Sequence, residues 1–358
     1  MKAKTSSQSN RPKAGRSALL ILSGIIVGFI IGYFVFNTTK QPPPKTRINT
    51  STYQQKARKH FINPFSESKE FRSYDVRPIP DLETIINKTV EQQITASNAT
   101  SIAVYYRDLT NDQVIGVNET EKFSPASLLK VPVLITILKY AEDHPDVLTQ
   151  TIFYDAPVKA IHKDKPYGIS DYTVLIPGHH YSIDKLLEIM IMISDNDATI
   201  LLLKFIDQQA PGLRESVEQE LKLNTGHQDP STDFVSVKGY SSFFRTLYNA
   251  SFLNEEMSEK ALQILSKTGY GNGIRLVVPK DIVLSQKFGH RKIDETHEQY
   301  HHFAIVYHQN KPFLLGIMTK GKTNEQLQAA IASIADTIYK SVDKQTQEHP
   351  SYISRDVD

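Results

Sequence analysis

The sequence contains no cysteine, so it can form no disulfide, no thiolate metal site and no lipid-bearing cysteine. Acidic residues are missing from residues 1–17, which carry a net charge of +5. Charge of either sign is missing from residues 18–36. The rest of the chain has a net charge of −3, and this balance gives no reason to expect a nucleic-acid partner.

The uncharged run from Ala18 to Phe36 has 19 residues, which is enough to span a bilayer. The basic residues before it predict a cytoplasmic N-terminus, with the remainder of the chain outside. A cleaved signal peptide is the alternative, but residues 37–42 offer no small-x-small cleavage site. We therefore expect an uncleaved, single-pass anchor in the cell membrane and an extracytoplasmic domain.

Composition divides the chain into five predicted parts. They are a basic cytoplasmic tail (1–17), a transmembrane anchor (18–36), a linker with three consecutive prolines (37–75), a folded domain (76–345) and a C-terminal tail (346–358).

Hydrophobic periodicity in the folded part predicts a helix, two strands, a block of helices, three strands and a closing helix. The helices are expected at 81–95, 128–138, 182–193, 198–206, 213–223, 236–248 and 326–340. The strands are expected at 101–106, 114–117, 282–288, 302–307 and 313–318. This order indicates an α/β (α+β) fold, in which both chain ends build an antiparallel sheet flanked by helices and an all-helical lobe is inserted.

A candidate nucleophile, Ser127, precedes a long apolar helix. Ser124 and Pro125 read as the N-cap and first residue of that helix, which places Ser127 in the first turn near the positive end of the helix dipole. Lys130 follows three residues later on the same face. A lysine in an apolar pocket has a lowered pKa and can take the proton of a serine hydroxyl. The same Ser-x-x-Lys spacing occurs at Ser66, Ser182 and Ser341. Only Ser127 both heads a long apolar helix and has suitable companion motifs downstream.

The triplet Ser194-Asp195-Asn196 occurs once, between two apolar helices. It can be a plain connection between helices. It can also supply a hydroxyl that shuttles a proton and an amide that binds a substrate.

A third motif would contain a lysine, and the sequence offers two candidates for it. Lys267-Thr268-Gly269 follows the helical stretch 259–266, where Gly269 suits a helix end. Lys287-Phe288-Gly289 ends a predicted strand and opens the run of three strands. Because a strand edge can present a charge to a substrate, we interpret Lys287 as the functional lysine.

In this order the three motifs resemble the penicillin-recognising serine enzymes, and class A β-lactamases most closely. The resemblance covers roughly residues 80–342, and Pro279 stands where the family has a proline before the third motif. It implies a β-lactamase/transpeptidase-like fold and no cofactor.

The resemblance also implies roles for single residues. Ser127 would be the nucleophile, Lys130 its base or the partner of its base, and Ser194 the relay of a proton to the leaving nitrogen. The backbone N–H groups of Ser127 and His290 would stabilise the oxyanion, and Lys287 would lower the pKa of Ser194 and attract a carboxylate. The substrate-binding residues it implies are Asn196, Lys287, Gly289 and His290.

Two departures from the family pattern affect turnover. Phe288 replaces the hydroxyl residue that binds the substrate carboxylate in the family. Glu220-Leu221-Lys222-Leu223-Asn224 matches the letters of the family's deacylation motif but falls within the predicted helix 213–223. Asp229 and Asp233 are alternative bases, and the spacing does not choose between them. Without a placed carboxylate, an acyl-enzyme should persist.

Two histidine pairs, His179-His180 and His301-His302, have the letters of metal ligands. Adjacent residues on a strand point to opposite faces of the sheet. We therefore expect no metal site at either pair.

The leading hypothesis is an extracytoplasmic serine hydrolase that forms an acyl-enzyme on Ser127. Its partner would be a small-molecule β-lactam or a peptide derived from peptidoglycan, besides the membrane around residues 18–36. A D-alanyl peptidase of the penicillin-binding type is one alternative. A non-catalytic module that binds a cell-wall fragment is the other.

The expected topology can be tested directly. N-terminal sequencing of the protein extracted from membranes should begin before Ala18, because the basic flank favours retention and no cleavage site follows the apolar run. A mature sequence that begins beyond Phe36 would contradict an uncleaved anchor.

Overall fold

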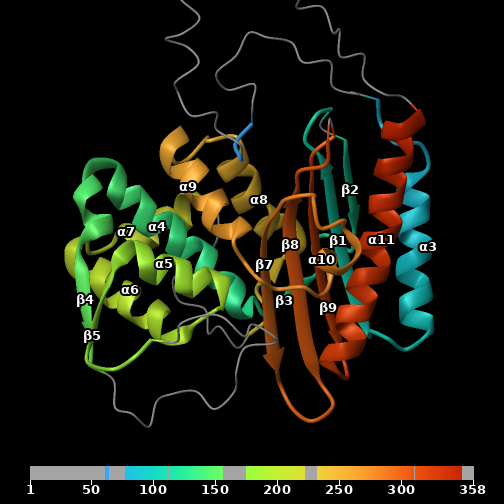
Figure 1. Cartoon of the computed structure of the whole chain (residues 1–358). Helices are drawn as coiled ribbons and strands as arrows, with labels where there is room; N and C mark the ends of the chain where they lie inside the picture. The colour runs from blue at the N-terminus through green and yellow to red at the C-terminus, as the bar shows by residue number, and fades with distance from the viewer. Residues whose placement is uncertain are drawn as a thin grey trace, which may run out of the picture. The chain divides into compact units, whose positions relative to one another are not determined.

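A five-stranded antiparallel sheet with the order β2-β1-β9-β8-β7 forms the centre of the fold (Figure 1). Its strands are β1 (Ser101–Asp108), β2 (Val114–Val117), β7 (Leu284–Lys292), β8 (Glu298–Val306) and β9 (Phe313–Gly321). Strand β1 lies beside β9, so the two ends of the domain share one sheet. This confirms the predicted lobe built from both chain ends.

The computed structural model describes residues 61–63, 77–111, 113–155, 175–221, 232–309 and 311–348. All of them belong to one compact unit, Lys59–Asp358. The predicted basic tail and anchor, residues 1–36, lie outside the described ranges. Within those ranges, every helix is too short or too polar to cross a bilayer.

Both faces of the sheet are buried, and they belong to two hydrophobic cores. Ala103 and Tyr105 of β1 point into the core of the helical lobe, whereas Val104 and Tyr106 point into the core beneath α3 and α11. The alternation follows from the two-residue period of a strand. Helices α3 (Leu82–Thr95) and α11 (Asn324–Glu348) cover the second face (Figure 1).

The helical lobe lies between β2 and β7 in the chain and packs against the other side of the sheet (Figure 1). Its helices are α4 (Lys130–Asp143), α5 (Ile183–Met192), α6 (Asn196–Gln209), α7 (Leu213–Glu220), α8 (Val237–Tyr248) and α9 (Glu255–Ser266). Two small ribbons attach to it, one formed by β3 (Lys122–Phe123) and β6 (Val235–Ser236), the other by β4 (Thr151–Tyr154) and β5 (His179–Ser182). A one-turn helix, α10 (Ile274–Val277), packs beside α11.

Short polar residues start several of these helices where the sequence predicts. Ser182 accepts a hydrogen bond from the backbone N–H of Lys185, and Ser236 accepts one from that of Gly239. Each bond satisfies a donor that the first turn of a helix leaves without an intrahelical partner. The predicted starts of α5 and α8 are therefore confirmed.

The start of the helix after Ser124 was predicted wrongly. Ala126 has a positive φ of 50°, so the backbone cannot enter an α-helix there, and a 3-10 turn, η1 (Ala126–Leu129), precedes α4. Pro125 occupies the position before η1, and the hydroxyl of Ser124 accepts from Arg291 Nη1 at 3.3 Å, so Ser124 is not a helix cap. Pro132 lies in the first turn of α4, where its missing N–H costs little.

Strand β7 and helix α11 are among the elements that run further than predicted. Strand β7 continues past Phe288 to Lys292, because it pairs with β8 along its whole length. Lys287 therefore lies in the middle of an edge strand and not at its end. Helix α11 continues to Glu348, beyond the expected domain end at residue 345.

A short segment of the predicted linker packs against the domain. The backbone N–H groups of Phe61 and Ile62 donate to the carboxylate of Glu259 on α9, and Ile62 is only 4% exposed. The hydroxyl of Tyr307 donates to the carbonyl of Phe61. Residues 61–63 thus form part of the folded unit.

Candidate active site

Ser127 and Lys130 are joined by a direct hydrogen bond. The 3-10 turn and the first turn of α4 bring Lys130 Nζ to 3.0 Å from Ser127 Oγ. Lys130 is 4% exposed, whereas Ser127 is only half-buried. The pair therefore combines an accessible hydroxyl with a buried amine, as the motif predicts.

The Ser194 triplet meets the same amine. Lys130 Nζ donates to the carbonyl of Ser194 at 3.0 Å, to its Oγ at 3.2 Å and to Asn196 Oδ1 at 2.8 Å. Ser194 has a positive φ of 57°, and Asp195 caps α6 by accepting from the N–H of Ala198. This cap and this turn place the side chains of Ser194 and Asn196 against Lys130 of α4.

Lys287 reaches the triplet from the sheet. Its Nζ donates to Ser194 Oγ at 3.1 Å and to the carbonyl of Phe288 at 2.9 Å. The residue is 1% exposed. The hydroxyl of Ser194 thus lies between two lysine amines, one from α4 and one from β7.

Burial changes the acidity of both lysines. It lowers the pKa of Lys130 to about 8, although the charge of Asp195 acts in the opposite direction. The pKa of Lys287 is lowered well below its ordinary value, mainly by burial and further by the charge of Lys130. An amine with a pKa near 8 is partly neutral at neutral pH and can accept a proton.

The competing lysine has a different environment. Lys267 is the C-cap of α9 and forms an ion pair of 2.6 Å with Glu188. Its side chain is 42% exposed. The structure brings Lys287, and not Lys267, to Ser194 and Lys130.

Gly289 allows the edge of β7 to approach the nucleophile turn. A Cβ at this position would lie 2.8 Å from the carbonyl oxygen of Pro125 and 2.9 Å from Leu128 Cγ. Any side chain would therefore push η1 away from the strand. The next residue, His290, continues the same edge strand, and its ring contacts Glu298 Oε2 at 2.8 Å.

Phe288 points to the opposite side of the sheet from Gly289. Its ring stacks on Tyr270 at a centroid distance of 4.2 Å and on Tyr300 at 6.0 Å. It is 7% exposed, and Lys287 Nζ lies 4.4 Å from the ring centroid. The position therefore offers an aromatic face to Lys287 and no hydroxyl.

Two of the three candidate bases for deacylation, Glu220 and Asp233, lie in described parts of the chain, and neither bonds to Ser127. Glu220 is exposed at the last residue of α7. Asp233 bonds to Gln299 and Lys320, and Asp229 lies outside the described residues. Among described side chains, no carboxylate forms a hydrogen bond or ion pair with Ser127 or Lys130.

The paired histidines separate as the strand period requires. His301 Nε2 donates to the carbonyl of Ser124, whereas His302 contacts Gln286 and the N–H of Ile274 on the other side of the sheet. His179 and His180 are exposed on β5.

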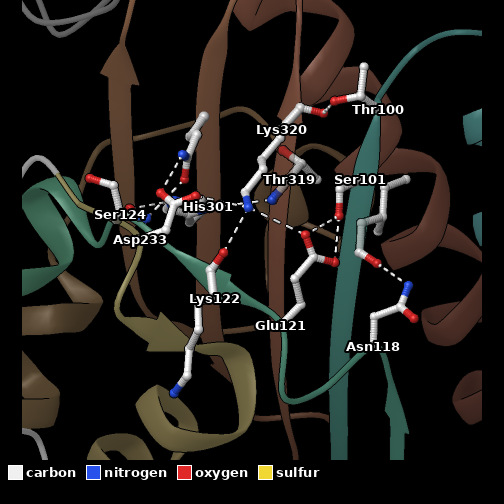
Figure 2. Close-up of polar contacts among 12 residues, drawn as sticks. Thr100, Ser101, Asn118, Glu121, Lys122, Ser124, Asp233, His301, Thr319 and Lys320 are labelled. Carbon is white, nitrogen blue, oxygen red and sulfur yellow. Dashed lines mark hydrogen bonds and ion pairs between the residues drawn. The ribbon is translucent and has the colours of Figure 1, made fainter.

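Sequence reasoning missed the residues that hold the nucleophile turn from behind. The buried hydroxyl of Tyr240 on α8 donates to the carbonyl of Leu128 at 2.7 Å. His301 bonds to Ser124 and Lys320 bonds to Lys122 (Figure 2). Gln299 accepts from the N–H of Ser124. No local pattern marks these residues, because they come from distant elements.

The profile of a family described as "Beta-lactamase enzyme family" matches residues 82–342. Among solved structures, a mutant of PBP-A in an acyl-enzyme complex with penicillin G is 20% identical, with a TM-score of 0.60 over 75% of this chain and 98% of that chain. A beta-lactamase from Xanthomonas campestris pv. campestris is 17% identical, with a TM-score of 0.60 over 73% and 98%. A class A beta-lactamase from Mycobacterium abscessus is 17% identical, with a TM-score of 0.59 over 72% and 99%. No curated protein sequence matches the chain.

The pKa of Lys130 predicts a pH profile for acylation. If neutral Lys130 takes the proton of Ser127, the rate should rise about tenfold per pH unit below pH 8 and level off above it. Asp195→Asn keeps a capping side chain but removes the charge that raises this pKa, so its profile should shift to lower pH. Acylation rates of the wild type and of Asp195→Asn, measured from pH 6 to 10, test both expectations. A flat profile would contradict a role for Lys130 as base.

The two lysines can be separated by substitution. Lys287→Ala should abolish acylation, because it removes the amine that contacts Ser194 Oγ. Lys267→Ala breaks only a partly exposed ion pair and should leave the acylation rate within a few-fold. The rate of covalent labelling by a β-lactam, measured by intact mass, compares them. The reverse order of effects would show that Lys267 serves the site.

Proposed function

The chain belongs to the beta-lactamase enzyme family, and from this membership and the site geometry we propose that it opens a β-lactam or a related cell-wall amide through an acyl-enzyme on Ser127. The observation that carries the proposal is the hydrogen-bonded series Ser127 Oγ, Lys130 Nζ, Ser194 Oγ and Lys287 Nζ, with successive distances of 3.0, 3.2 and 3.1 Å. It connects a nucleophile with a base and with a path for the proton.

The first step forms the bond between Ser127 Oγ and the carbonyl carbon of the substrate. Neutral Lys130 takes the hydroxyl proton, which its pKa of about 8 allows. Negative charge then develops on the carbonyl oxygen, and the backbone N–H groups of Ser127 and His290 are the donors proposed to stabilise it.

The second step breaks the carbon–nitrogen bond. Ser194 gives its proton to the leaving nitrogen and is reprotonated by the ammonium of Lys130, with which it shares a hydrogen bond. Lys287 Nζ donates a hydrogen bond to Ser194 Oγ, and this bond stabilises the negative charge that develops on the oxygen during the transfer. The product is an ester on Ser127, and Lys130 returns to its neutral form.

Asn196 and Lys287 are the proposed contacts for the substrate. Asn196 Oδ1 accepts from Lys130, which leaves the amide NH₂ to donate to an acyl side chain. Lys287 is almost fully buried and already donates to Ser194 and to the carbonyl of Phe288. With a phenyl ring at position 288, we infer that a substrate carboxylate gains little binding energy here.

Hydrolysis of the ester needs a base for water. Within the described ranges, no carboxylate forms a hydrogen bond or ion pair with Ser127 or Lys130, which supports slow deacylation. A D-alanyl peptidase would share the acylation steps, and a binding module would lack them.

We also propose, from the sequence alone, that residues 18–36 anchor this domain outside the cytoplasmic membrane.

A long-lived adduct is the expected outcome with a reactive β-lactam. A general base typically accelerates such a step about 10²–10⁴-fold, and the acyl-enzyme should persist without one. The purified full-length chain is mixed with penicillin G and followed by intact mass and by absorbance. The mass of the adduct should appear, persist, and be absent in Ser127→Ala.

The controls distinguish the alternatives. Penicillin G methyl ester should react at a rate comparable to that of penicillin G, because Phe288 offers the carboxylate no hydroxyl. Rapid turnover that is lost in Glu220→Gln, but kept in Glu215→Gln on the same helix, would identify Glu220 as the deacylating base and contradict slow turnover. No adduct and no turnover with a panel of β-lactams would favour a binding module. Release of D-alanine from stem peptides would favour the peptidase.

A further inference from the structure

The segment Lys122–Ser124 leads into the nucleophile turn but is poorly fixed by strand pairing. Its strand, β3, pairs with only the two residues of β6. Strand β3 is not part of the five-stranded sheet, so side chains must hold this segment against that sheet. A cluster of polar side chains from β8, β9 and the stretch before β6 does so (Figure 2).

Lys320 on β9 is the centre of this cluster. Its Nζ donates to the carbonyl of Lys122 at 2.8 Å and lies 4.5 Å from the ring centroid of Phe123. It also forms ion pairs with Asp233 at 2.9 Å and with Glu121 at 3.4 Å. The side chain of Lys320 therefore contacts strand β3, Glu121 just before β3, and Asp233 just before β6.

Asp233 connects Lys320 to Ser124 through the side chain of Gln299. Its carboxylate accepts from Gln299 Nε2 at 2.8 Å, and Gln299 Oε1 accepts from the backbone N–H of Ser124 at 3.0 Å. On the other side, His301 Nε2 donates to the carbonyl of Ser124 at 2.8 Å, while its Nδ1 accepts from the N–H of Thr319. Both backbone groups of Ser124 are thus fixed by fully or nearly fully buried side chains.

The backbone beyond Ser124 needs such anchoring. Ala126 has a positive φ, a conformation that residues with a Cβ rarely adopt, and Ser127 follows it in a 3-10 turn. Backbone of this kind persists only where its surroundings over-determine it. The 3.0 Å contact between Ser127 and Lys130 depends on that turn.

We propose that Lys320, paired with Asp233, is a positioning residue for Ser127. It fixes β3 and the start of the nucleophile turn so that the hydroxyl meets Lys130. This role rests on the proposed function, because its catalytic consequence appears only if Ser127 is acylated. Lys320 touches neither Ser127 nor a proton in transit, and it acts through the backbone of residues 122–124.

The inference separates reactivity from stability. Lys320 and Asp233 are partly exposed, with side-chain exposures of 27% and 39%. Ion pairs of this kind contribute little to the free energy of unfolding. A misplacement of about 1 Å, by contrast, can cost a catalysed step about 100-fold. Loss of the pair should therefore reduce the acylation rate strongly and change the melting temperature little.

The first measurement is the kinetics of acylation by a fluorescent penicillin in the full-length chain. Lys320→Met keeps the aliphatic stem and should lower the acylation rate constant per active molecule about tenfold or more, with non-covalent affinity unchanged. Lys320→Arg keeps the charge and should restore most of the rate. Lys340→Met, which breaks an exposed ion pair of 2.7 Å with Asp336 on α11, is the matched control.

The second measurement needs no substrate. Hydrogen exchange of the Ser124 and Leu128 amides should accelerate in Lys320→Met, while that of amides in β1 stays unchanged. If the wild type forms no adduct, the proposed function fails, and the exchange alone decides whether Lys320 holds this segment.

Three results would overturn the inference. They are unchanged exchange at Ser124, an acylation rate within twofold of wild type in Lys320→Met, and an equal loss of rate in Lys340→Met.

Discussion

The structure depends on the burial of two lysine amines around one serine hydroxyl. Removing an ammonium from water is costly, and two ammonium groups repel each other, so both conditions favour the neutral amines. Lys130 and Lys287 tolerate the arrangement because the Ser194 hydroxyl and nearby carbonyl oxygens accept their hydrogen bonds. The same desolvation that lowers the pKa of Lys130 makes it a useful base. The desolvation that costs folding free energy is therefore also what makes Lys130 reactive.

The fold brings these groups together from separate elements. Ser127 comes from η1 and Lys130 from the first residue of α4. Ser194 comes from the turn between α5 and α6, and Lys287 from the edge of the sheet. Close contact between the helical lobe and that edge requires Gly289, since a Cβ there would clash with the nucleophile turn. Positive φ angles at Ala126 and Ser194 aim the two hydroxyls. The lobe and the sheet thus act as two rigid supports for one small site.

Local signals predicted much of the fold, and their failures share a cause. The predicted helix starts at Ser182 and Ser236 are correct. The structure shows both serines as caps, and a cap depends on neighbours within three residues. Ser124 was predicted as a cap in the same way, yet its hydroxyl bonds to Arg291 and its backbone to Gln299 and His301. The end of β7 was misplaced because pairing with β8 extends it beyond its apolar run. Tertiary contacts therefore override propensity at the site.

The sequence alone determined the order of elements, the spacing of Ser127 and Lys130, and the preference for Lys287 over Lys267. These follow from residue patterns with a fixed local period. Only the tertiary structure decided that Ser194 lies between two amines and that Phe288 faces Tyr270 and Tyr300. It also revealed the support of β3 by Lys320, which is almost two hundred residues away in the chain. Contacts between distant residues leave no periodic trace in one sequence, so packing alone fixes them.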